Sequence, residues 1–424
     1  MSQTAPPLSR AWLVVGLLWF VVCFNYIAGL MLTTMHGSIL ASLPMSETQF
    51  GLLTSSALWT FGLTSAVAGF ASDRFGRSRV IVASLLVWSS LTIGCAYAGS
   101  FLQLLALRGL MGAAEAFYMP SALALISEYH PGSTRSLATG VHQTGICAGI
   151  GLAGLGGWLA EMRTWHFAFA VVGVAGIAYA GLLAALLRDV PSPEAAGDGL
   201  GGAAAPARFG QALACLFGRR SRRPFGLALA NFSLIGLTSW TVISWMPVFF
   251  HEHFHLAQGT AGFSANFYAS AAMVPGMLIG GAWADRWSRT NRRARMLVPA
   301  FGLLLAAPCI LLTATTSLLL AGIIGIVCYR MFSVFTDSNM MPILCEIVDS
   351  RYRATAYGLL NLTGTTVAGL GVFLTGTIRD SRIDLAVIFG GIGAITALSA
   401  PLFFMIRPRA GEERASGRAS TLTP

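Results

Sequence analysis

Two matched stretches of the 424-residue chain each carry an arginine and, seven residues later, a carboxylate. An arginine keeps its positive charge and presents a planar fork that fits a carboxylate or a phosphate, whereas a carboxyl group can bind and release a proton. Seven residues are about two helical turns, so on a helix the two groups share a face about 10 Å apart. The pairs are Arg108 with Glu115 and Arg330 with Asp337, and they predict anion binding by the arginines and proton exchange by the carboxyls.

The segments that hold these pairs are strongly apolar. Hydrophobic residues make up 55% of the chain and charged residues 10%, with a mean hydropathy of +0.69, which is too apolar for an ordinary soluble protein. A charge at mid-bilayer costs at least ~2.5 kcal/mol, so the four charged side chains should face a central cavity. Runs long enough to cross about 30 Å of hydrocarbon predict an all-α membrane protein with twelve transmembrane helices. The predicted spans are 11–36, 49–70, 80–99, 101–127, 136–160, 166–187, 224–250, 260–283, 296–315, 318–345, 355–378 and 385–406.

The positions of the arginines give the predicted helices a sidedness. The net charge of +10 comes from arginines alone, because the chain has no lysine. If the chain starts in the cytoplasm, only Arg163, Arg379 and Arg382 fall in outer loops, which is the positive-inside bias. We therefore expect a multi-pass protein of the cell membrane, the inner membrane of a bacterium, with both termini cytoplasmic, a lipid bilayer as its surroundings and no nucleic-acid partner.

An internal repeat divides the chain into two related six-helix bundles. The stretch from Gly69 to Arg77 recurs from Gly281 to Arg289, each with an Asp-Arg-aromatic-small-Arg pattern, and Glu128 with Arg135 has the same spacing as Glu346 with Arg353. The two arginine and carboxylate pairs are part of this repeat, each with a proline twelve residues after the arginine (Pro120 and Pro342). The predicted organisation is an N-terminal bundle at 1–187, a cytoplasmic linker at 188–223 that ends in a short interfacial helix, a C-terminal bundle at 224–407 and a cytoplasmic tail at 408–424.

With these features the chain resembles the major facilitator superfamily over essentially its full length, carried by the loop Gly69 to Arg77, its copy and the two-bundle plan. The fourth-span pattern from Arg108 to Pro120 looks like that of the anion:cation symporters. This resemblance implies secondary active import of a small organic anion, a sugar acid or another carboxylate, by proton symport with alternating access. It also implies that the loop residues and the acidic residues near them act in gating. These gating candidates are Asp73, Arg74, Arg77, Glu128, Arg135, Asp285, Arg286, Glu346 and Arg353.

The first span departs from that family pattern. The sugar-acid symporters carry Asn-Tyr-x-Asp-Arg there, whereas this chain has Asn25, Tyr26, Ile27, Ala28 and Gly29. Both ionisable residues are missing, so Glu115 and Asp337 are left as the proton-coupling candidates. With Arg108 and Arg330, the substrate-binding candidates are Asn25, Tyr26, His142, Gln143, Trp240, Trp245, Tyr268 and Asn361; each of these uncharged residues also fits a role in packing or helix association.

Other functions remain as alternatives. A drug or metabolite efflux antiporter would share the fold, but the Gly-Pro of its fifth-span signature is absent at Leu152 and Ala153. A sensor that binds an anion without transporting it would need a signalling partner. We expect no enzymatic activity, cofactor or metal site, since the chain has no P-loop, nucleophile motif or spaced metal ligands. The expected partners are an anionic small molecule and protons, and we expect the protein to act as a monomer.

Overall fold

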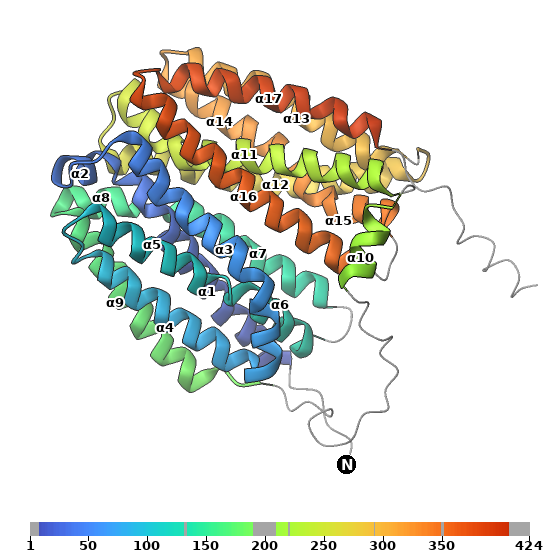
Figure 1. Ribbon diagram of the computed structural model, residues 1–424, viewed down its shortest axis with the longest axis horizontal. Coiled ribbons are helices and arrows are strands. Elements are labelled where there is room, and N and C mark those ends of the chain that lie inside the picture. The colour runs from blue at the N-terminus through green and yellow to red at the C-terminus, as the bar shows by residue number, and fades with distance from the viewer. Residues whose placement is uncertain are drawn as a thin grey trace, which may run out of the picture.

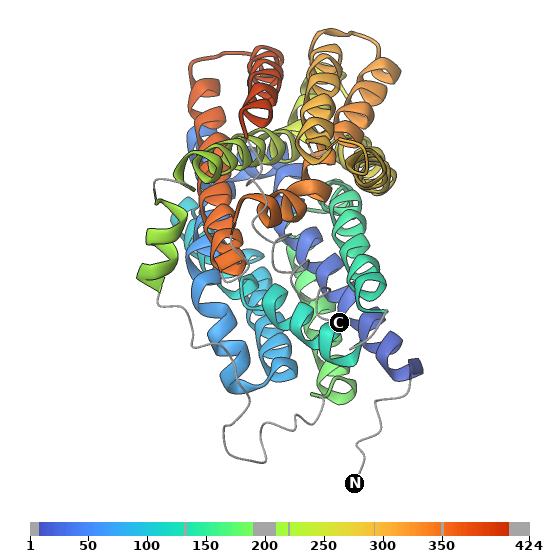
Figure 2. The same cartoon turned by 90° about the vertical axis from the view of Figure 1, so that its right-hand side faces the viewer.

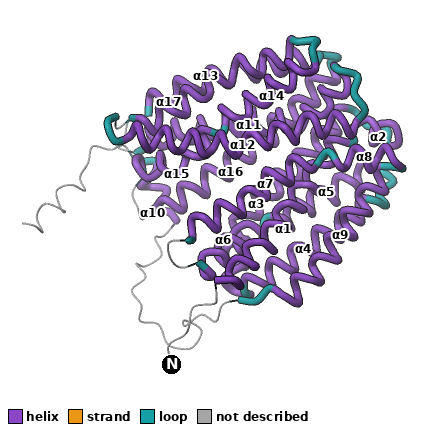
Figure 3. Tube along the Cα trace, turned by 180° about the vertical axis from the view of Figure 1, so that it is seen from behind, coloured by secondary structure: helices purple, strands orange, loops and turns teal. Residues whose placement is uncertain are grey.

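The computed structural model describes residues 8–130, 134–189, 209–218, 221–291, 293–348 and 352–406, and within these ranges every regular element is a helix (Figure 3). The predicted all-α class is therefore confirmed. The helices are α1 (Leu8–Thr34), α2 (His36–Ser42), α3 (Glu47–Phe75), α4 (Arg77–Cys95), α5 (Phe101–Glu115), α6 (Tyr118–Tyr129), α7 (Arg135–Leu152), α8 (Leu155–Met162), α9 (Trp165–Leu186), α10 (Phe209–Leu216), α11 (Arg222–His253), α12 (Gln258–Ser288), α13 (Ala294–Thr315), α14 (Leu319–Ser333), α15 (Phe335–Ile347), α16 (Arg353–Asp380) and α17 (Leu385–Met405).

The helices form two groups that lie side by side. Helices α1 to α9 pack against one another, and so do α11 to α17, while the main contacts between the groups join α3 to α16 and α12 to α7 and α8. The groups meet at the end of the molecule that carries α2 and α8, and they diverge toward the end that carries α6, α10 and α15 (Figures 1 and 2). We call these the α2 end and the linker end.

Eleven helical segments within the described residues are long and apolar enough to cross a membrane. The expected second span, 49–70, lies within α3, which is 29 residues long. Helix α3 packs between α5 of its own group and α16 of the other.

Several predicted spans are built from two helices rather than one. Span 101–127 is divided between α5 and α6 at Ala116 and Phe117, and span 318–345 between α14 and α15 at Val334. Pro120 accounts for the first break, because a proline ring clashes with the carbonyl four residues earlier, which is that of Ala116. Pro342 lies inside α15, whose helix continues through it. The repeated sequence therefore does not give repeated local structure.

The loop between α3 and α4 depends on one glycine. Gly76 has φ of 86° and ψ of 135°, a conformation essentially restricted to glycine, and it ends α3 and starts α4. The backbone and side chain of Ser78 donate hydrogen bonds to Asp189 Oδ1 over 2.7 and 2.9 Å, so the start of the linker covers this loop. In the repeat the corresponding residue is Ser288, which is the last residue of α12, and the turn before α13 follows it.

Candidate functional site

A central cavity lies between the two groups of helices. It encloses about 90 Å³, enough for several waters or part of a small solute. Both groups contribute: α1, α3 and α5 from the first, α11 and α16 from the second. The lining residues are Asn25, Tyr26, Gly29, Leu30, Thr54, Ala57, Leu58, Phe61, Arg108, Glu115, Trp240 and Thr365.

One wall of this cavity is a face of α3 that no sequence motif identifies. Its residues Thr54, Ala57, Leu58 and Phe61 follow the i, i+3, i+4, i+7 spacing of a single helical face. These residue types are ordinary for a membrane helix. Their spacing predicts that they share one surface of the helix, but it does not predict what that surface contacts. Thr54 donates its hydroxyl hydrogen to the carbonyl of Phe50 in its own helix, which leaves this wall mainly apolar.

Arg108 forms the charged part of the cavity and is almost completely buried, at 2% exposure. Its Nη2 donates to the carbonyl of Gly29 over 2.8 Å and its Nη1 to the carbonyl of Ala28 over 3.4 Å. These acceptors belong to the two first-span positions where the symporter pattern has Asp and Arg. The backbone of α1 thus holds the guanidinium in place without supplying a counter-charge.

Glu115 lines the same cavity at the last residue of α5. The broken helix ends there, so the carboxyl group lies where the chain turns between α5 and α6. Three buried polar atoms around the cavity lack a hydrogen-bond partner, and such atoms are costly to bury without a ligand or water. They are Asn25 Nδ2, Arg108 Nε and Glu115 Oε1.

The matching pair in the second group is placed differently. Arg330 is also buried, at 5% exposure, but its Nη2 lies 3.1 Å from the sulfur of Met273, and it lines a separate small pocket with Asn266 and Ser270. Asp337 lies in the first turn of α15 and is exposed, close enough to Arg330 to interact electrostatically. Neither residue lines the central cavity.

The uncharged substrate candidates divide between the cavity and other places. Asn25, Tyr26 and Trp240 line the cavity. His142 is buried between helices, with its Nε2 2.8 Å from Tyr118 Oη, and Trp245 donates to the carbonyl of Val372 at the α2 end. Three more are absent from the lining: Gln143 and Tyr268 are exposed and Asn361 is half-buried.

The gating candidates of the first group lie at the linker end. Arg77 forms an ion pair with Glu128 and so connects the start of α4 to α6. Arg135 donates to the carbonyls of His130 and Ser127, and Arg74 is exposed with its guanidinium 5.9 Å from the ring centre of Phe75. The side chain of Asp73 lies outside the described residues.

The second group makes corresponding contacts with a different arginine. Arg295 pairs with Asp285 over 3.4 Å and with Glu346 over 3.5 Å, although Arg289 is the repeat position of Arg77. Arg353 donates to the carbonyl of Cys345 over 3.0 Å, and Arg286 is exposed. Comparison of the halves did not identify Arg295, which lies near the start of α13, because the connection from α12 to α13 is longer than the single Gly76 that separates α3 from α4.

Similar proteins were found along most of the chain. The Probable galactarate/D-glucarate transporter GudP of Bacillus subtilis is 26% identical, with 92% of this chain and 90% of the relative covered. The Probable sulfoacetate transporter SauU of Cupriavidus necator is 25% identical, with 95% and 97% covered. A 29% identical match to the Gallate transporter of Pseudomonas putida covers 43% of this chain and 41% of the relative.

The fold has a counterpart among solved structures. A bacterial homolog of the human lysosomal transporter Spinster, in an inward-facing and unoccupied conformation, matches with a TM-score of 0.73 at 20% identity and covers 94% of this chain and 95% of that chain. The family model described as Major Facilitator Superfamily matches residues 18–372. The two-group helical fold, the relatives and the family match agree that this chain is a transporter of the Major Facilitator Superfamily and not an enzyme.

Proposed function

We propose that this protein imports a small organic anion, a sugar acid or another carboxylate, by proton symport. The observation that carries the proposal is the central cavity, where Arg108 and Glu115 lie among residues from both groups of helices. Arg108 contacts the carbonyls of Ala28 and Gly29 and the sulfur of Met111, none of which is negatively charged, so its positive charge is available to an anion. Relatives along most of the chain carry the names of galactarate, glucarate and sulfoacetate transporters, all of which denote organic anions.

The arrangement of the halves supports alternating access. Contacts between the groups hold the α2 end closed, and the groups diverge toward the linker end (Figure 1). We place the linker end and both termini in the cytoplasm, because that end carries most of the arginines and the α2 end carries Arg163, Arg379 and Arg382. In this orientation the conformation opens inward, in a bacterial inner membrane, and the protein acts as a monomer.

The roles follow from position. Arg108, Asn25, Tyr26 and Trp240 bind the anion, and Glu115 exchanges the proton beside it. The remaining substrate candidates join the site when the halves move, and Asp337 is a second proton-coupling carboxyl. The gating candidates at the linker end form different ion pairs when that end closes. The remaining substrate candidates are Arg330, His142, Gln143, Trp245, Tyr268 and Asn361. The gating candidates are Asp73, Arg74, Arg77, Glu128, Arg135, Asp285, Arg286, Glu346 and Arg353.

Uptake by purified protein in proteoliposomes tests this proposal. The candidate substrates are a panel of sugar acids, aromatic and aliphatic carboxylates, sulfonates and sugar phosphates, with and without an imposed pH gradient and in the absence of sodium. We expect at least one organic anion to accumulate only while the outside is more acidic. Accumulation that persists after the gradient is collapsed would contradict proton symport, and accumulation of neutral sugars alone would contradict anion recognition by Arg108.

A further inference from the structure

A second cluster of charged side chains joins the two groups of helices at the α2 end, well apart from the central cavity. His36 Nε2 lies 2.9 Å from Glu47 Oε2, while Arg379 Nη2 donates to Glu47 Oε1 over 3.1 Å and to Glu252 Oε1 over 2.8 Å. His36 and Glu47 belong to the first group, on α2 and α3, and Glu252 and Arg379 to the second, on α11 and α16. The side chains of His36 and Arg379 are only 8% and 12% exposed, whereas that of Glu252 is 42% exposed, so water screens the charges of this cluster only in part.

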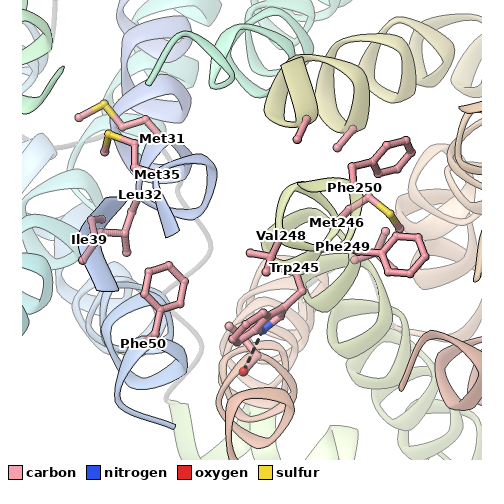
Figure 4. Packing of buried hydrophobic residues seen from close by; sticks show 14 of the residues in the cluster. Met31, Leu32, Met35, Ile39, Phe50, Trp245, Met246, Val248, Phe249 and Phe250 are labelled. Atoms are coloured by element: carbon pink, nitrogen blue, oxygen red, sulfur yellow. Dashed lines mark hydrogen bonds between the residues drawn. The ribbon is translucent and has the colours of Figure 1, made fainter. Parts of the chain in front are cut away.

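The surroundings of the cluster give it a fixed geometry. The carboxylate of Asp380 accepts hydrogen bonds from the backbone of Glu47 over 2.9 Å and of Thr48 over 3.1 Å, which caps the start of α3 with a residue of the other group. Beneath it lies an apolar cluster shared by both groups (Figure 4). Figure 4 shows Phe50 of α3 and Trp245 of α11 on the two sides of the interface, with their ring centres 5.8 Å apart, whereas Met31 and Met35 point into the first group and Phe249 into the second.

The cluster has one more negative than positive charge when the imidazole is neutral, even without Asp380. The ligand atoms of His36, Glu47 and Glu252 all lie within 4.8 Å of one another, so two carboxylates face each other across the interface and share a single arginine. Glu47 precedes the predicted span 49–70; burial disfavours its charged form, but hydrogen bonds from His36 and Arg379 hold the pKa of its carboxyl below the ordinary value. Glu47 therefore stays charged at pH values where a histidine ordinarily titrates.

Protonation of His36 would offset this excess charge. Its ring nitrogen contacts a different oxygen of Glu47 from the one that Arg379 uses, so both cations fit around that carboxylate. The new charge would also attract Glu252, which belongs to the other group of helices. The other titratable groups nearby are Asp380, which caps α3, and His251, whose Nδ1 lies 2.5 Å from the carbonyl of Leu256. Trp245 contributes an uncharged ring 6.1 Å from the His36 ring.

We propose that His36 is a proton-binding site at the α2 end, and that protonating it stabilises the closed contact between the two halves. The proposal rests on the proposed transport function and on the α2 end facing outward. An acidic exterior then favours the conformation that opens to the cytoplasm. His36 is the first residue of α2 and only Met35 separates it from α1, so this site places an ionisable group close to the helix that lacks the Asp and Arg of the symporter pattern.

Distance measurements between spin labels test this proposal without a substrate. Labels on Tyr97→Cys and Ile383→Cys, both exposed in turns at the α2 end, report the separation of the two groups in a background without the seven native cysteines. Between about pH 8 and about pH 5.5, where a histidine titrates, we expect the ratio of short to long distances to rise about fivefold, the effect of one partly screened ion pair.

Three variants separate the titration of His36 from that of the other histidines at the α2 end. His36→Gln keeps a hydrogen-bond donor near Glu47 but cannot be protonated, so its ratio of short to long label distances should not change with pH. His36→Lys should show the short distance already at about pH 8, and His255→Gln, an exposed histidine of the same end, should respond as the unaltered protein does.

A pH response that survives in His36→Gln, or one that is lost in His251→Gln instead, would overturn the assignment to His36. The result is independent of the proposed transport activity, because the labels report closure in the absence of any anion. Failure of uptake with an intact pH response would remove the proposed function and leave the proton site, and the reverse result would remove only the proton site.

Discussion

The two arginine and carboxylate pairs have the same spacing, yet they lie in different surroundings. Arg108 is held by the backbone of α1, and Glu115 lines the same cavity. Arg330 contacts a methionine sulfur in a small separate pocket, and Asp337 is exposed. The helices that carry the two pairs break at different places. Helix α5 ends at Glu115, so both members of the first pair lie on it, whereas the break at Val334 places Arg330 on α14 and Asp337 on α15. Sequence repetition therefore preserves which residues are present, and the local breaks decide what they contact.

The largest predicted difference between the halves concerns the arginines. Arg108→Lys should lower the initial uptake rate of the accumulated anion by about 10- to 100-fold, because the ammonium cannot reproduce a planar fork held by two carbonyls. The initial uptake rate of Arg330→Lys should stay within about fivefold of that of the unaltered protein, since the lysine keeps the positive charge and this position lies outside the cavity. The measurement is initial uptake in proteoliposomes at equal protein content. Equal losses in the two variants would show that both halves bind the anion alike.

The carboxyls should differ in coupling rather than in binding. One coupled proton raises the accumulation ratio about tenfold per pH unit of gradient, and Glu115→Gln should reduce that ratio to about one while anion exchange continues. Asp337→Asn should lower the accumulation ratio less than Glu115→Gln does, because the carboxyl of Asp337 does not line the cavity. Counterflow and gradient-driven uptake, measured on the same vesicles, distinguish the two effects. If Glu115→Gln still accumulates the anion fully, Glu115 has no coupling role.

The loop and its copy should differ in their need for glycine. Gly76→Ala should destabilise the protein by about 1–3 kcal/mol, because its backbone conformation suits only glycine, and an added Cβ would lie 2.8 Å from Asp189 Oδ2. Ser288→Ala should change stability by no more than about 0.5 kcal/mol, since Ser288 is the last residue of a helix and has no positive φ. Thermal unfolding in detergent compares the two, and a neutral Gly76→Ala would show that the loop relaxes.

The smallest expected difference concerns the loop aspartates. Asp73→Asn should lower initial uptake by about two- to fivefold without reducing the amount of protein in the membrane, as expected for the loss of one charge in gating. Asp285→Asn should have less effect, because Arg295 also pairs with Glu346 and keeps that contact. Uptake normalised to surface expression is the measurement. Unchanged rates in Asp73→Asn would leave this loop with a role in topology alone.

The sequence alone was sufficient for the class of the protein and for the central charged residues. Apolar runs predict membrane helices because the bilayer imposes length and hydrophobicity, and buried charges such as Arg108 and Glu115 stand out against that background. The Gly69 to Arg77 loop and its copy indicate the family, since the Asp-Arg-aromatic-small-Arg pattern is a local signal in the sequence. Each of these signals depends on residues close together in the chain.

Only the tertiary structure decided which residues meet. The face of α3 that lines the cavity has ordinary residue types. Arg295 rather than Arg289 pairs with Glu346, because α13 begins later relative to the repeat than α4 does. The cluster of His36, Glu47, Glu252 and Arg379 brings together residues as many as 343 positions apart, the separation of His36 and Arg379. Such contacts depend on where each helix breaks and on how the two groups of helices approach each other. Both are set by packing between segments that are distant in the sequence, so no local sequence pattern predicts them.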